Sequence, residues 1–120
     1  MSKSLSWMIF ALGIGHILYG LISFRLPLAA ALSDGLFDQF KAHQGRLAAF
    51  WFLAFGPLLM LAGQLCLNAV AGGDLATVRL IARYLLGLAL MGVLAFPRSP
   101  FLAVLPIAAL LLAQGYGLLS

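Results

Sequence analysis

Five side chains with polar or titratable groups lie inside stretches of sequence that are otherwise apolar. They are His16, Gln64, Arg83, Tyr84 and Gln114. A neutral imidazole can donate one hydrogen bond and accept another, and a guanidinium suits an anionic group. Because polar side chains are costly inside a membrane, residues of this kind indicate a functional site. We therefore take these five as candidate ligand-binding residues.

His16 lies near the middle of the first apolar stretch, Trp7 to Phe24, which carries no formal charge at neutral pH. A helix rising about 1.5 Å per residue would cross most of a hydrocarbon core of about 30 Å there, with His16 near the midplane. Gly13 and Gly20 lie three residues before and four after His16, so all three share one helix face. This pattern predicts space beside the imidazole. A ligand contact and a structural hydrogen bond to a backbone carbonyl both remain open.

Apolar stretches separated by charged or proline-rich breaks dominate the chain. Its 120 residues are 64% hydrophobic and 8% charged, against about 25% charged in ordinary soluble domains. The pattern predicts an all-α fold, an integral membrane four-helix bundle in a single domain. The expected spans are residues 7–24, 46–67, 75–96 and 101–119. Asp74 is the expected N-cap of the third span.

A short helix is expected between the first two spans. Ser33 or Asp34 could cap it, and it would continue to about Gly45. Leu36, Phe37 and Phe40 would fall on one side, as in a helix that lies in the membrane interface. The alternative is an N-terminal extension of the second span.

Antiparallel spans would place the polar side chains within one half of the bilayer. Gln64, Arg83, Tyr84 and Gln114 come to similar depths, and His16 lies somewhat deeper. This arrangement predicts one internal cleft with Arg83 at its rim. Two other interpretations stay open, because glutamines often tie helices together and an arginine can extend to the headgroups.

Several function classes are excluded by what the sequence lacks. Cys66 is the only cysteine, so no disulfide within the chain, CxxC motif or cysteine metal cluster can form. No carboxylate lies inside an expected span, and neither HExxH nor a Ser/His/Asp pattern occurs. We therefore assign no catalytic residue and no metal site. A haem would need His16 as a lone axial ligand, or a second His16 from a partner, and the cofactor question stays open.

The net charge and a stripe of small residues indicate which partners the chain could have. The net charge is +4 and its basic residues are scattered, which argues against nucleic acid. Basic residues are nearly balanced between the two expected sides, so charge sets no orientation. Ala109, Ala113 and Gly117 recur every four residues in the last stretch. This stripe favours close helix contact, either within the bundle or between copies in a homo-oligomer.

The chain resembles small bacterial inner-membrane proteins with four helices, an uncharacterised group close to the DoxX-like families. The resemblance rests on a glycine-flanked histidine, an aromatic and glycine-containing second stretch, and a proline-bounded last turn. These are Gly13, His16 and Gly20; Phe50, Trp51, Phe52, Gly56 and Gly63; and Pro97 to Pro100. The resemblance implies a multi-pass protein of the bacterial inner membrane. It carries no established activity or catalytic residue.

Two hypotheses for function follow. In the first, the protein is a binding or accessory module that holds a hydrophobic or lipid-like molecule, or pairs with a membrane partner. In the second, it is a membrane enzyme or proton-coupled transporter in which His16 titrates. We favour the first, because a catalytic site usually shows more than one convincing ionisable group.

Overall fold

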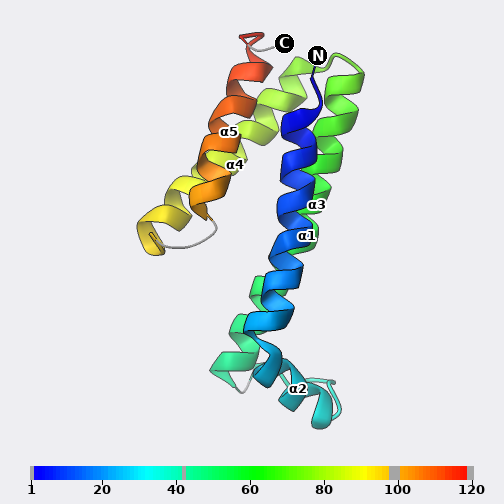
Figure 1. Cartoon of the computed structure of the whole chain (residues 1–120), viewed down its shortest axis with the longest axis vertical. Coiled ribbons are helices and arrows are strands. Elements are labelled where there is room, and N and C mark those ends of the chain that lie inside the picture. Colours follow the sequence, from blue (N-terminus) through cyan, green and yellow to red (C-terminus); the bar gives the residue numbers. More distant parts are fainter. Residues whose placement is uncertain (1, 42, 98–100, 119–120) are drawn as a thin grey trace. The chain divides into compact units, whose positions relative to one another are not determined.

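The chain is helical through most of the part that the structure describes. The computed structural model describes residues 2–41, 43–97 and 101–118. Its helices are, in order, α1 (Ser4–Ser23), α2 (Arg25–Ser33), α3 (Gln44–Ala71), α4 (Leu75–Ala95) and α5 (Phe101–Gly115), as Figure 1 shows. The described residues contain no strand. The all-α prediction is therefore confirmed, but the described helices number five and not four.

Three of the described helices are long and apolar enough to cross a membrane, judged by length and composition. These are α1 with 20 residues, α3 with 28 and α4 with 21. The apolar helix α5 has only 15 residues, which corresponds to roughly 22 Å, less than a hydrocarbon core of about 30 Å. The span expected at residues 101–119 is thus shorter than predicted.

Gly117 explains why α5 ends earlier than predicted. Gly117 adopts a left-handed backbone with φ of 76°, which a glycine accepts without steric cost. Its N–H donates to the Gln114 carbonyl, and the Leu118 N–H donates to the Ala113 carbonyl, both at 3.0 Å. This is the Schellman arrangement that ends a helix. The prediction that Ala109, Ala113 and Gly117 lie on one helix is therefore wrong for Gly117, which lies beyond the end of α5.

The short helix between the first two long helices lies earlier than predicted. Pro27 falls in the first turn of α2, where its missing N–H is tolerated. Gly35, with φ of 99°, then ends α2. The N–H groups of Gly35 and Leu36 donate hydrogen bonds to carbonyl groups in the last turn of α2. Asp34 is therefore the C-cap of α2, and not an N-cap. The helix predicted between Ser33 and Gly45 is wrong, and α3 begins only at Gln44.

Contacts divide the chain into two compact units. Unit 1 comprises Met1–Phe10 and Leu61–Ser120, and unit 2 comprises Ala11–Met60. Helices α1 and α3 each contribute one part to each unit. The candidate residues Gln64, Arg83, Tyr84 and Gln114 thus belong to unit 1, and His16 belongs to unit 2.

In unit 1, α4 and α5 pack side by side (Figure 1). The buried residues of α4 recur every three or four positions, which is the period of one helix face. They are Val78, Ala82, Leu85, Ala89 and Gly92, and they are matched on α5 by Val104, Ala108 and Leu111. Small side chains in this stripe let the two backbones approach closely. The turn expected at Pro97 to Pro100 lies largely outside the described residues.

Asp74 caps the N-terminus of α4, as the sequence predicted. Its carboxylate accepts one hydrogen bond from the Thr77 hydroxyl at 2.5 Å and one from the Thr77 backbone N–H at 3.1 Å. These bonds, the hydroxyl bond foremost, hold the pKa of Asp74 below its ordinary value of 3.8, because they favour the charged form. The cap therefore fixes where α4 begins.

Replacing Asp74 with alanine should lower thermal stability slightly at neutral pH and have less effect in acid. A carboxylate whose pKa is depressed by folding stabilises the fold fully above its unfolded pKa of 3.8, and that contribution is lost as the pH falls through the folded pKa. Thermal unfolding followed by circular dichroism at neutral and acidic pH measures the difference. Asp38→Ala, in a loop, is the control. An equal shift at both pH values would contradict the assignment.

Candidate functional site

His16 lies against two aromatic rings of α3 within unit 2. Its imidazole stacks on Phe52, with ring centres 3.8 Å apart and planes 16° apart, and lies 5.4 Å from the centre of the Phe55 ring. The imidazole also forms a hydrogen bond with the Phe52 backbone. Its Nε2 atom is buried and has no hydrogen-bond partner among the described residues. Nε2 is therefore a buried polar atom that the described fold does not satisfy.

Glycines on both helices allow this close arrangement. A Cβ atom on Gly20 would lie 2.7 Å from a ring carbon of Phe52, and one on Gly13 would lie 2.6 Å from the Gly56 carbonyl oxygen. Such separations are too short for real side chains, so α1 and α3 approach only because these positions are glycine. The space that the sequence predicted beside His16 is thus occupied by α3 itself.

A second polar group gathers at the end of α5 within unit 1. Arg83 donates from Nη2 to the Tyr116 hydroxyl at 2.6 Å, and Arg79 donates from Nη1 to the Gly115 carbonyl at 2.8 Å. The two guanidinium carbons lie 5.4 and 5.9 Å from the centre of the Tyr116 ring, within cation–π range. Arg79 and Arg83 are four residues apart, so they share one face of α4. No role for Tyr116 was predicted from the sequence.

The two glutamines of the candidate set have different surroundings. Gln114 is 1% exposed, and its Nε2 donates to the Ser2 carbonyl at 2.6 Å. That bond ties the start of the chain to α5, as expected for a glutamine that joins helices. Its Oε1 and the Ser6 hydroxyl are buried without a partner among the described residues. Gln64 and Tyr84, in contrast, are exposed.

The five candidate residues therefore fall into distinct places. Arg83 and Gln114 both meet the terminal segments of unit 1, whereas His16 contacts Phe52 and Phe55 in unit 2. The single cleft that would join all five remains a prediction.

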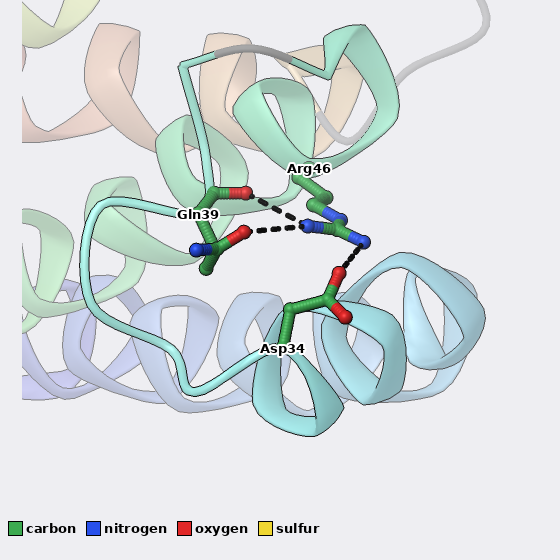
Figure 2. Close-up of polar contacts among 3 residues, drawn as sticks. All are labelled: Asp34, Gln39 and Arg46. Atoms are coloured by element: carbon green, nitrogen blue, oxygen red, sulfur yellow. Dashed lines mark hydrogen bonds and ion pairs between the residues drawn. The ribbon is translucent and has the colours of Figure 1, made fainter.

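Sequence reasoning missed a third polar group, which centres on Arg46 in unit 2. Figure 2 shows this side chain between Asp34 and Gln39. Nη2 contacts the Asp34 carboxylate at 2.6 Å, and Nη1 donates to the backbone and side-chain oxygens of Gln39 at 3.2 and 3.4 Å. Arg46 is only 8% exposed. It therefore fastens the loop after α2 to the first turn of α3.

No metal centre emerges from the part of the chain that the structure describes. There, no group of three or more histidine, cysteine, aspartate or glutamate side chains could hold a metal ion. Cys66 is a buried free cysteine on α3. Its position is consistent with the packing role that small thiols often have in protein interiors.

The part of the chain that the structure describes is all-helical and contains three helices that could cross a membrane by length and composition. The chain belongs to the Family of unknown function (DUF6463), whose family model matches residues 1–117. No curated protein and no solved structure matched the chain. The family match agrees with the expected membership of an uncharacterised group. Nothing in the comparisons supports the DoxX-like proteins specifically.

Proposed function

We propose that this protein is a multi-pass membrane protein that holds a hydrophobic or lipid-like molecule, alone or as an accessory to a membrane partner. In each of the three long apolar helices, under a third of the apolar window is buried within the chain. Most of that apolar surface therefore needs lipid or another hydrophobic molecule as its surroundings. We place the protein in the bacterial inner membrane, following the resemblance, with α5 as a shorter fourth membrane helix.

The observation that carries the binding proposal is the buried Nε2 of His16. A buried polar atom without a partner costs about 1–3 kcal/mol, so a site that keeps one usually has a reason. The free Nε2 of a neutral imidazole can either donate or accept one hydrogen bond, depending on the tautomer. It suits a molecule with a hydroxyl group on an apolar body.

The alternative is an enzyme or proton-coupled transporter in which His16 titrates. The two rings that contact His16 belong to Phe52 and Phe55, and neither can relay a proton. A transfer site usually needs a second ionisable group within reach. The surroundings of His16 therefore favour binding over proton transfer.

Native mass spectrometry of gently solubilised protein tests the proposal. His16→Phe should leave the protein helical but reduce a co-purifying hydrophobic molecule about tenfold or more, since one buried hydrogen bond is lost. His43→Phe is the matched control, because His43 is exposed in the loop before α3. If both variants retain the wild-type content of bound molecule and His16→Phe merely changes the unfolding temperature, His16 is structural and the proposal fails.

A further inference from the structure

Two arginines of α4 converge on the segment that follows α5. Arg79 and Arg83 are one helical turn apart, so they project from the same face. Both guanidinium groups lie within 6 Å of the Tyr116 ring centre. Arg83 donates a hydrogen bond to the Tyr116 hydroxyl, and Arg79 donates one to the carbonyl of Gly115, the last residue of α5. Two positive, donor-rich groups are thereby held around one aromatic ring.

Gly115 makes this arrangement possible. A Cβ atom at this position would lie 2.6 Å from Cγ of Arg79 and 3.0 Å from its backbone nitrogen. A larger residue would push the end of α5 away from α4. The glycine therefore brings both the Gly115 carbonyl and the Tyr116 ring to the two arginines.

Among the described residues, no carboxylate forms an ion pair with Arg79 or Arg83. The chain has three acidic side chains. Each forms a hydrogen bond or an ion pair with another residue, and Asp74 also interacts electrostatically with Arg79. The pairings are Asp34 with Arg46, Asp38 with Lys41, and Asp74 with Thr77 at the start of α4. The C-terminus of α5 supplies only about half an elementary negative charge. Because Arg79 and Arg83 carry two full positive charges and neither forms an ion pair with a described carboxylate, positive charge remains available to an anion.

The depth and geometry of the pair fit a phosphate group. Arg79 and Arg83 are the fifth and ninth residues of α4, about 6 and 12 Å from its start, a depth from which arginines reach lipid headgroups. The planar guanidinium donates two parallel hydrogen bonds to phosphate oxygens, which an ammonium does not. Tyrosine is also favoured at the level of the headgroups.

We propose that Arg79 and Arg83, framed by Tyr116, bind the phosphate of an anionic lipid headgroup. This inference rests on the proposed function of holding a lipid-like molecule, and it names the headgroup chemistry. The site belongs to unit 1 and uses neither His16 nor Gln64. Tyr116 acts as a positioning residue, because its hydroxyl accepts the hydrogen bond that orients Arg83.

Lipid retention in native mass spectrometry tests the site. Detergent-solubilised protein is mixed with equal amounts of phosphatidylglycerol and phosphatidylcholine. Wild-type protein should retain phosphatidylglycerol preferentially, and the double variant Arg79→Gln/Arg83→Gln should retain about tenfold less of it, because charge-assisted hydrogen bonds are lost. Arg25→Gln, which changes an exposed arginine of α2, should leave retention unchanged.

Two further variants separate geometry from charge. Tyr116→Phe keeps the ring but removes the acceptor for Arg83, so retention should fall by a smaller factor. Tyr19→Phe, at an exposed position of α1, should have no effect. If the glutamine variant does not fold, Arg79→Lys/Arg83→Lys keeps both charges and removes the planar forks. The lysine variant should still prefer phosphatidylglycerol, because it keeps both charges, but it should retain less of that lipid than the wild type.

Inorganic phosphate distinguishes a site for free phosphate ions from a site for the phosphate of a lipid headgroup. Excess phosphate that raises the unfolding temperature of lipid-free wild-type protein, but not of the double variant, would support a phosphate site open to free anions. No such rise, with arginine-dependent retention of phosphatidylglycerol, supports the lipid headgroup. Equal retention of both lipids by the wild type, or unchanged retention by a folded double variant, overturns the site. If the arginine variants retain less phosphatidylglycerol than the wild type and His16→Phe does not, only the role proposed for His16 is refuted.

Discussion

Replacing Gly13 with alanine is expected to destabilise the packing of α1 on α3 within unit 2. The added Cβ would lie 2.6 Å from the Gly56 carbonyl oxygen and 2.8 Å from the Met60 backbone nitrogen. Because both are backbone atoms, no change of rotamer relieves the clash. Alanine normally gains about 1 kcal/mol over glycine inside a helix, but overpacking of this kind costs about 1–3 kcal/mol or more. Thermal unfolding in detergent, followed by circular dichroism, should show a net loss.

Gly15→Ala is the matched control for this prediction. It lies two residues along the same helix, and nothing stands within 4 Å of an added Cβ. The gain in helix propensity is the same, so Gly15→Ala should leave the unfolding temperature unchanged or raise it. Because the glycine contact holds His16 against Phe52, Gly13→Ala should also reduce any bound molecule. Equal unfolding temperatures for the two variants would refute the close contact.

The long apolar helices could be predicted because hydropathy is a property of the local sequence. The third expected span, residues 75–96, matches α4 to within one residue. Its start carries a side-chain signal as well, since Asp74 caps it through a bond only three residues away. Local composition and a local hydrogen bond thus agree on the same boundary.

Glycine explains why other helix boundaries were missed. Gly35, Gly73 and Gly117 adopt left-handed conformations and end helices. Gly13, Gly20 and Gly56 lie inside helices, where they admit a neighbouring helix. The same residue type serves both roles, and only the neighbouring helix distinguishes them. The sequence interpretation treated Gly117 as a packing residue, whereas it ends α5.

The polar groups were harder to predict because their partners are distant in sequence. The spacing of Arg79 and Arg83 showed that they share a face, but Tyr116 is 33 residues beyond Arg83. Asp34 lies 12 residues before Arg46, across a loop in which Leu36 and Asp38 have positive φ. No hydrophobic period specifies a loop of that kind. Only the folded backbone brings these side chains together.

Replacing Arg46 with methionine is expected to release the loop at residues 34–43 from α3. Methionine keeps much of the apolar stem but removes the ion pair to Asp34 and both bonds to Gln39. Breaking a fully buried pair costs about 3–5 kcal/mol, and an exposed pair about 1 kcal/mol or less. Arg46 is buried, but the Asp34 side chain is 52% exposed, so we expect about 1–3 kcal/mol, between these limits. Hydrogen exchange of the loop amides should accelerate markedly.

Lys41→Met provides the control for the release of this loop. Lys41 and Asp38 also form an ion pair, at 3.5 Å, but their side chains are 78% and 57% exposed. Solvent and salt screen such a pair, so its loss should change stability by at most about 0.5 kcal/mol. Both variants remove one positive charge, and only Arg46→Met removes a buried one. Rapid exchange in Arg46→Met but not in Lys41→Met would therefore assign the ordering of the loop to the guanidinium contacts, whereas equal exchange in the two variants would refute that role.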